Sequence, residues 1–138
     1  MTREAIEPAG LYPSRPYGFS QVIVAEAART VYCAGIVAWD EHQTLVGPGD
    51  FAAQMAKALD NVHLALASAG ATPADVVHLR LYIVDYNPGL LTTIGAQLNA
   101  FFGSAAPAAN TVLGVQCLAL PDLLIEIEAT AVLGGRGT

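Results

Sequence analysis

The segment FAAQMAKALDNVHLALASAGATPADVVHLRLYIV, residues 51–84, contains a helical pattern followed by a strand pattern, and it decides the fold class. In its first half, apolar residues recur every three or four positions, which is the spacing of one face of a helix. Asp50 is a suitable N-cap and Gly70 a suitable stop. We therefore predict an amphipathic helix between them, with an apolar stripe of Phe51, Met55, Leu59, Val62 and Leu66.

The second half of this segment predicts a short turn and then a strand. Thr72, Pro73 and Asp75 supply the cap, the first helical position and the acidic first turn of a single helical turn. Residues 76–84 alternate apolar and polar side chains, which is the period of a strand. The polar face of this strand carries His78, Arg80 and Tyr82.

The regions on both sides extend the pattern. Upstream, apolar runs at residues 19–25 and 31–34 flank a polar break, which suggests a hairpin. Downstream, a second amphipathic helix ends at Gly103, and residues 112–118 and 123–132 predict two more strands. The resulting order of elements is β-β-α-β-α-β-β.

This order predicts a single α+β domain over residues 1–138, with one mixed sheet and two helices on one of its faces. Residues 1–16, which contain three prolines, are predicted to be an irregular lead-in, and residues 133–138 a flexible tail. The chain is 54% hydrophobic and only 13% charged, whereas an average soluble domain is about 25% charged. We therefore predict that the second sheet face is buried against other subunits in a closed oligomer.

Charge and composition argue against several classes of function. The net charge is −6 and the six basic residues are scattered, so no basic stripe is present to follow a nucleic acid. The apolar runs are too short to cross a bilayer, and the first residues lack a signal-peptide core. Neither Cys33 and Cys117 nor the three histidines have a metal-binding spacing. We expect a cytoplasmic protein without a metal site that binds neither nucleic acid nor membranes.

The last strand contains the candidate site. In LLIEIEATAV, Leu123–Val132, the two carboxylates Glu126 and Glu128 share one face, because successive side chains of a strand point to opposite sides. A carboxylate at a partly dry interface is costly unless it is paired. For Glu128, a salt bridge to Arg80 is the structural alternative to a functional role, and we favour Glu126 as a functional group.

Four stretches together resemble the RidA/YjgF family, the reactive intermediate deaminases. In chain order, they are FSQ followed by CAG near the start, DNVHLALASAGATPADVVHLRLYIVD through the middle, AFFG at the end of the second helix and IEIEATA in the last strand. The resemblance runs from about Phe19 to Val132. It implies a chorismate-mutase-like fold and a homotrimer, in which three sheets form an inner barrel and a small-molecule cleft lies between adjacent subunits. The best-known members hydrolyse enamines and imines to ketones and ammonia, and they need no metal or cofactor.

The resemblance also assigns roles to residues. The family glutamate that corresponds to Glu126 holds or protonates the water that attacks the imine carbon, which requires a group that can deliver and accept a proton. The backbone at Ala34 and Gly35 borders the same cleft. The family serine is replaced by Ala34, which Cys33 precedes.

Other positions depart from the family pattern. The arginine that binds the substrate carboxylate is missing, because PAANTV places Ala109 or Asn110 at its position. The family tyrosine is replaced by Phe19, with Tyr17 two residues earlier, and Gly95 stands where the second helix has asparagine. These changes predict a roomier, more apolar pocket whose substrate is not a simple α-imino acid. The side chains expected to supply hydrogen bonds there are Asn110, Thr111 and Tyr17.

Three functions remain open from the sequence. The first is a cofactor-free hydrolase of enamines or imines that uses Glu126. The second is a small-molecule-binding or regulatory trimer without turnover, which would explain the loss of the carboxylate-binding arginine. The third is an endoribonuclease, a label that some relatives carry, although the net charge of −6 argues against it.

Overall fold

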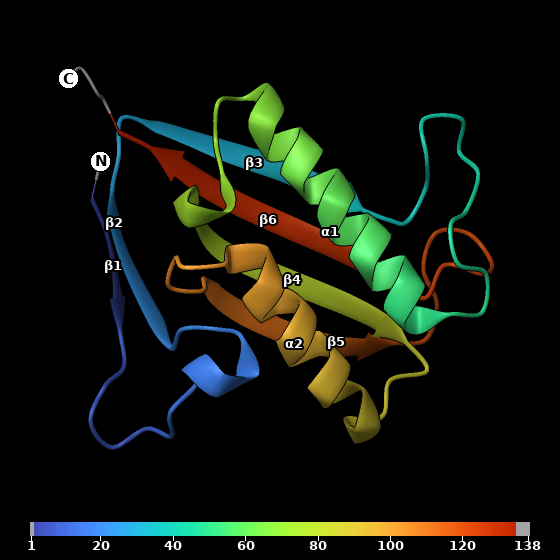
Figure 1. Ribbon diagram of the computed structural model, residues 1–138, viewed down its shortest axis with the longest axis horizontal. Helices are drawn as coiled ribbons and strands as arrows, with labels where there is room; N and C mark the ends of the chain where they lie inside the picture. The colour runs from blue at the N-terminus through green and yellow to red at the C-terminus, as the bar shows by residue number, and fades with distance from the viewer. Residues whose placement is uncertain (1, 135–138) are drawn as a thin grey trace.

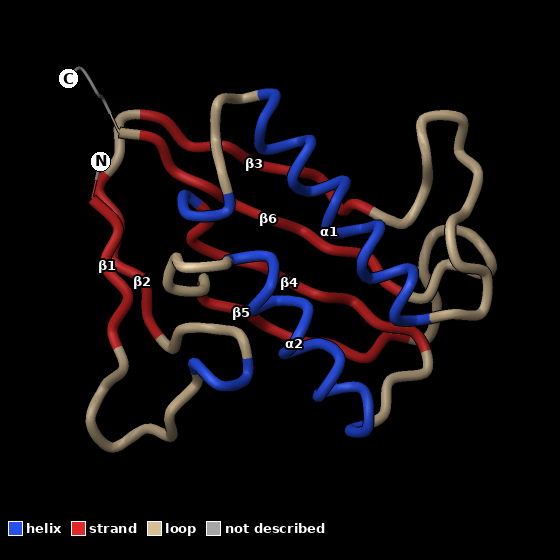
Figure 2. The backbone as a smooth tube through the Cα atoms, viewed as in Figure 1, coloured by secondary structure: helices blue, strands red, loops and turns tan. Residues whose placement is uncertain are grey.

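The computed structural model describes residues 2–134, and Figures 1 and 2 show how its elements are arranged. Its strands are β1 (Thr2–Ile6), β2 (Val22–Glu26), β3 (Arg29–Ile36), β4 (Val76–Val84), β5 (Ala109–Val115) and β6 (Ile125–Leu133). Its helices are α1 (Phe51–Ser68) and α2 (Leu91–Phe102), with short 3-10 turns η1 (Arg15–Tyr17), η2 (Pro73–Asp75) and η3 (Pro88–Leu90). The predicted order of helices and strands is confirmed, and β1 precedes it as an additional strand.

Four strands form a mixed sheet in the order β3-β6-β4-β5, and both helices cover one of its faces (Figure 1). Strand β5 runs parallel to β4, whereas β6 is antiparallel to both β3 and β4. The apolar stripes of α1 and α2 pack against the buried residues of β4 and β6 in one core. The predicted α+β class, with two helices on one face of a sheet, is therefore confirmed.

The prediction of one sheet that begins with a hairpin is wrong. Strand β2 pairs with β1 in a separate antiparallel sheet, whereas β3 pairs with β6. The irregular lead-in predicted for residues 1–16 is also wrong, because it contains β1. The first proline is Pro8, so the backbone of Thr2–Ile6 can extend, and β2 offers it an edge. Strand formation depends on such a neighbour as much as on local propensity.

Helix α1 has the predicted cap and one unpredicted buried polar residue. The Asp50 carboxylate accepts a hydrogen bond from the backbone N–H of Ala53 at 3.0 Å, which satisfies a free donor of the first turn. Gln54, one turn into the helix, is fully buried. Its Nε2 donates to the Asp122 carbonyl at 3.0 Å, and its Oε1 accepts from the Leu124 N–H at 2.9 Å. Gln54 thus holds the start of β6, the strand that carries Glu126.

The strand boundaries differ from the predicted ones mainly near the C-terminus. Strand β4 has its predicted bounds, whereas β5 begins and ends three residues before the predicted 112–118. Of the flexible tail predicted for 133–138, Leu133 belongs to β6, and residues 135–138 lie outside the described part of the chain.

The first and last strands meet at one short connection. Thr2, the first residue of β1, pairs with Glu26 at the end of β2. Leu133, the last residue of β6, pairs with Arg29 at the start of β3 and accepts a hydrogen bond from the Ala28 N–H at 3.0 Å. Both ends of the described chain therefore lie beside residues 26–29 (Figure 1).

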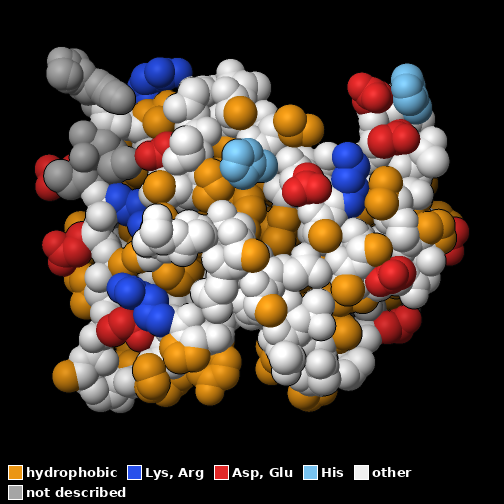
Figure 3. Space-filling model, viewed as in Figure 1, with side chains coloured by type: hydrophobic (Ala, Val, Ile, Leu, Met, Phe, Trp, Pro, Cys, Tyr) orange, Lys and Arg blue, Asp and Glu red, His pale blue; other side chains and the backbone are white. Residues whose placement is uncertain are grey.

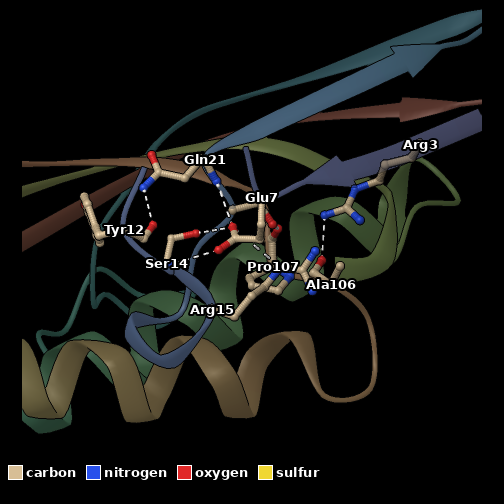
Figure 4. Close-up of polar contacts among 9 residues, drawn as sticks. Arg3, Glu7, Tyr12, Ser14, Arg15, Gln21, Ala106 and Pro107 are labelled. Carbon is tan, nitrogen blue, oxygen red and sulfur yellow. Dashed lines mark hydrogen bonds and ion pairs between the residues drawn. The ribbon is translucent and has the colours of Figure 1, made fainter. Parts of the chain in front are cut away.

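A polar network fastens the N-terminal segment to the loop before β5 (Figure 4). The Arg3 guanidinium donates to the carbonyl of Val76 at 2.8 Å and to that of Ala106 at 2.7 Å. The Glu7 carboxylate accepts hydrogen bonds from the N–H and the hydroxyl of Ser14. The Ser20 hydroxyl donates to the Pro107 carbonyl. These bonds position η1 and the residues after it beside the start of β5.

Candidate functional site

The face of the sheet that the helices leave open carries Glu126 beside Gly35. Strand β3 has a bulge here: Cys33 pairs with Ala129 and Ile36 pairs with Ile127, so three steps along β3 oppose two along β6. A Cβ atom placed on Gly35 would lie 2.6 Å from the Cδ of Glu126. Only glycine leaves room for the carboxylate directly over this main chain.

This pair of residues lines a pocket of about 420 Å³. That volume is within the range of small-molecule sites. The pocket combines strand residues of β3, β4, β5 and β6 with the segment that follows β5. Its lining residues are Gly35, Tyr82, Val115, Cys117, Leu118, Ala119, Glu126 and Glu128.

One carboxylate oxygen of Glu128, Oε1, is engaged by two neighbours on β4. The Tyr82 hydroxyl donates to its Oε1 at 2.6 Å, and the Arg80 Nη1 lies 3.5 Å from the same atom. The hydrogen bond from Tyr82, supported by the Arg80 charge, lowers the pKa of Glu128. The same hydrogen bond raises the pKa of Tyr82. The salt bridge to Arg80, the structural alternative for Glu128, is therefore present.

Glu126 differs from Glu128 in its partners. It pairs with Tyr82 across the ladder, but its side chain makes no hydrogen bond or ion pair with any residue in the described range 2–134. The side chain is half-buried and lines the pocket. Both of its oxygens are free to bind a water molecule or a ligand, whereas the Oε1 of Glu128 is already bound by Tyr82 and Arg80.

The remaining predicted site residues form a second group around the start of β5. Ser20 forms a parallel bridge to Ala109, and its N–H donates to the Ala108 carbonyl at 2.8 Å. This places Phe19 near Ala109. The Tyr12 ring packs edge-to-face on the rings of Tyr17 and Phe19, with centroids 6.2 and 6.3 Å apart. An aromatic cluster is thus adjacent in sequence to Ser20, the residue that bridges Ala109, and its Tyr17 backbone packs against Gly95 of α2.

Ala109 and Asn110 point to opposite sides of the sheet. Asn110 pairs with Leu79, which is buried under the helices, and its Oδ1 is buried without a hydrogen-bond partner in the described part of the chain. Ala109 pairs with His78, on the open side. Ala109 thus occupies the open-face position. Thr111, two residues further on, is exposed on the same side opposite Arg80.

The two groups of predicted residues are separate within one chain. Ala109 pairs with His78, whereas Glu126 pairs with Tyr82, four residues further along β4. At about 3.3 Å per residue, these positions are about 13 Å apart along the strand. Gly35 and Ala34 lie at the Glu126 end, on β3. The predicted site residue Cys33 does not face this pocket, because it pairs with the buried Ala129 and packs against the core under the helices. A single chain therefore does not bring Phe19 and Glu126 into one pocket.

Sequence reasoning does not identify two parts of the pocket. Tyr82 belongs to the predicted polar face of β4, but only the strand register places it opposite Glu126. Cys117 and Leu118 fall at the end of the strand predicted over 112–118, but β5 ends at Val115, and these two residues and Ala119 lie in the connection to β6.

The profile of the family described as Endoribonuclease L-PSP, which includes the YjgF and RidA proteins, matches residues 10–133. The chain belongs to this Rid family. It is similar to YyfB of Yersinia pestis, a Rid protein of unknown function, with 52% identity, a TM-score of 0.94, and coverage of 96% of this chain and 100% of that one.

More distant Rid structures have the same fold. Rv2704 of Mycobacterium tuberculosis, a member of the YjgF/YER057c/UK114 family, is 30% identical, with a TM-score of 0.61 and coverage of 96% of this chain and 100% of that one. The YjgF gene product of E. coli is 27% identical, with a TM-score of 0.65 and coverage of 93% and 92%. The chorismate-mutase-like α+β fold implied by the resemblance is therefore confirmed.

Within residues 2–134, this Rid protein has no group of three His, Cys, Asp or Glu side chains placed to hold a metal ion. In the same range, no helix has the length and apolar character needed to cross a bilayer.

Proposed function

We propose that this Rid protein hydrolyses small enamines or imines, with Glu126 as the acid and base. Glu126 accepts a proton from the water that adds to the carbon of the C=N bond and delivers it to the nitrogen, which gives a carbinolamine. Glu126 then moves the hydroxyl proton of this intermediate to the nitrogen, so that the C–N bond breaks, ammonia leaves and a ketone remains. The observation that carries this proposal is the contrast between the two carboxylates of the pocket. Glu128 is occupied by Tyr82 and Arg80, whereas Glu126 lies over Gly35 with its oxygens free.

The substrate we infer lacks a carboxylate. Ala109 cannot bind a carboxylate at the position where the best-known members have arginine. Arg80, which faces the same side of the sheet, is already paired with Glu128. The aromatic residues around Phe19 instead favour an apolar or aromatic substituent, because ring stacking and apolar burial are the interactions they offer.

We further propose that the complete cleft forms between subunits of a homotrimer. On the open sheet face, Tyr32 is 80% exposed and Leu113 is 41% exposed. Large apolar side chains exposed on both edge strands of the same sheet face favour an interface between subunits. The separation of about 13 Å between the Ala109 and Glu126 positions supports the same arrangement, since a neighbouring copy can supply the aromatic group.

The first experiment measures ammonia release from freshly generated imines. One set of substrates carries a carboxylate and the other is neutral and aromatic. We expect hydrolysis of the neutral set, and a rate about a hundredfold to ten-thousandfold lower for Glu126→Gln. Glu41→Gln, which removes an exposed carboxylate of the loop before α1, is the matched control and keeps full activity. Unchanged activity in Glu126→Gln would contradict the proposal.

A mixing experiment tests the shared cleft. Glu126→Gln and Phe19→Arg each remove one half of the cleft, and each is expected to be inactive alone. If a cleft takes Glu126 from one subunit and Phe19 from the next, mixed trimers contain some intact clefts, and activity partly returns after subunit exchange. Absence of recovery, with exchange verified by mass spectrometry, argues for a cleft within one chain.

A binding or regulatory trimer without turnover is the second candidate, and the missing arginine favours it. In that case a small molecule raises the melting temperature of the protein but is recovered unchanged. This alternative is supported if both the wild-type protein and Glu126→Gln bind the compound and neither forms ammonia or a ketone.

The net charge and the paired arginines of this chain give little support to the endoribonuclease activity for which the family is named. The net charge is −6. Arg3 is hydrogen-bonded to two carbonyls, Arg15 lies 3.9 Å from the Glu7 carboxylate, and Arg80 is paired with Glu128. Nucleic-acid binding depends on cations that are free to neutralise phosphates. RNA binding that weakens steeply with salt would revive this function.

A further inference from the structure

The outer face of the helical layer carries a groove that is separate from the Glu126 pocket. It lies between α1 and α2 and has a volume of about 440 Å³. Figure 3 looks onto this face, where hydrophobic side chains are visible between the two helices. The sheet lies between this groove and the open face, so a ligand in one site cannot touch the other.

The groove exists because two of the residues that line it have small side chains. Ala56 of α1 and Ala100 of α2 are exposed and end at a methyl group, while Leu59 is 5% exposed and forms the floor. The Phe101 ring forms one wall. Its centroid lies 6.2 Å from that of His63 in an edge-to-face contact, which fixes the ring orientation. The result is a depression of ligand size with apolar sides.

The polar groups of the groove are mainly acceptors. Asp60 is exposed, and its carboxylate makes no ion pair with any residue of the described range. The Gln97 Nε2 donates to the Ala52 carbonyl at 2.9 Å, which leaves the Oε1 of Gln97 as a free acceptor. The lining of the groove contains no lysine or arginine among the described residues. Such a site attracts a cationic donor and repels an anion.

We propose that this groove binds a small protonated amine with an apolar, flat body. The ammonium group donates to the Asp60 carboxylate and the Gln97 Oε1. The body of the ligand covers Ala56 and Ala100 and contacts the Phe101 ring, which also favours a nearby cation. Such a ligand matches both the charge and the shape of the groove, and its site does not depend on Glu126 chemistry.

Ligand-observed NMR and titration calorimetry test this proposal with phenethylamine as the probe. Phenethyl alcohol has the same shape without the charge, and hydrocinnamate has the opposite charge. We expect phenethylamine to bind about two- to fivefold more tightly than the other two, as one exposed ion pair allows. Asp60→Asn is expected to lower its affinity to that of the alcohol. Ala100→Leu fills the groove and is expected to abolish binding.

Controls separate this groove from the other pocket. Glu126→Gln and Glu41→Gln are both expected to bind phenethylamine like the wild-type protein. Leucine is a good helix former, so Ala100→Leu retains the fold, and circular dichroism verifies this. Equal binding of amine and alcohol, retained affinity in Asp60→Asn or Ala100→Leu, or lost affinity in Glu126→Gln would each overturn the proposal. A loss in Glu41→Gln would show only non-specific charge attraction and would overturn it as well.

Discussion

The carboxylate of Glu126 occupies the space that a side chain on Gly35 would need. A Cβ atom at Gly35 would lie 2.6 Å from the Glu126 Cδ. We therefore expect Gly35→Ala to displace the carboxylate and to lower imine hydrolysis by roughly a hundredfold, the usual cost of a catalytic group moved by about 1 Å.

The measurement for Gly35→Ala combines steady-state rates with thermal melting. The displaced atoms are at the end of a flexible side chain, so the melting temperature is expected to change little. A variant with wild-type activity would show that the position of Glu126 over Gly35 does not matter for turnover.

The hydrogen bond between Tyr82 and Glu128 gives a prediction about ionisation. It raises the pKa of Tyr82 and lowers that of Glu128. In Glu128→Gln the negative acceptor is gone, so the Tyr82 phenol is expected to ionise at a lower pH than in the wild-type protein. Ultraviolet difference titration, with Tyr82→Phe to assign the signal, measures the change. An unchanged titration curve contradicts the hydrogen bond.

The ionisation of Glu7 is expected to make the folded protein less stable in acid. Its hydrogen bonds from Ser14 lower its pKa below the ordinary 4.5. The ionised carboxylate therefore stabilises the folded state above that pH, and this contribution disappears as the pH falls through the lowered pKa. Glu7→Gln is expected to reduce the decrease in unfolding free energy between about pH 6 and about pH 3. Glu26→Gln, at the end of β2, is the control, and an identical decrease in both variants contradicts the role of Glu7.

Two glycines are expected to respond oppositely to alanine. Gly95 lies inside α2, and a Cβ there would be in ordinary contact with the Tyr17 carbonyl oxygen at 3.4 Å. Gly95→Ala is expected to raise the unfolding free energy by about 0.5–1 kcal/mol. Gly18 has φ +86°, and its Cβ would lie 2.8 Å from the Leu98 Cβ. Gly18→Ala is expected to destabilise by more than about 1 kcal/mol. Denaturant unfolding measures both free-energy changes, and changes of the same sign in the two variants would contradict this prediction.

The two cysteines are expected to differ in reactivity. Burial raises the pKa of the Cys33 thiol, whereas Cys117 is exposed and lines the Glu126 pocket. A thiol-specific reagent is expected to modify Cys117 first and to block the pocket. Mass spectrometry identifies the modified residue, and Cys117→Ser is expected to keep its activity after treatment. Inhibition that persists in Cys117→Ser would assign the effect to Cys33.

Local signals in the sequence predict the helices and β4 well. Helix α1 begins after Asp50 and β4 has its predicted bounds, because caps and periodicity depend on neighbouring residues only. Strand β1 is missed because its stability comes from pairing with β2, which is distant in sequence. The separate sheet it forms with β2 follows from the same pairing, which no local pattern encodes.

The candidate site is predictable to the extent that it depends on side-chain alternation. Alternation alone places Glu128 on the same face as Arg80 and so permits their salt bridge. The hydrogen bond from Tyr82, the bulge beside Gly35 and the orientation of Asn110 depend on the register between strands. Phe19 and Glu126 are grouped by the family resemblance, which implies a cleft between subunits, and one chain keeps the two residues apart.

Thr2 and Leu133 both lie beside residues 26–29, so the two ends of the described chain are close together. A short peptide can join these ends without crossing the sheet, and the exposed loop at 41–44 can then supply new ends. Residues 26–29 and Gly35 are at opposite ends of β3, so a linker attached near residues 26–29 lies away from the Glu126 pocket. Copies of the chain can therefore also be linked in tandem. For the proposed homotrimer, three linked copies permit Glu126 to be altered in a chosen number of subunits.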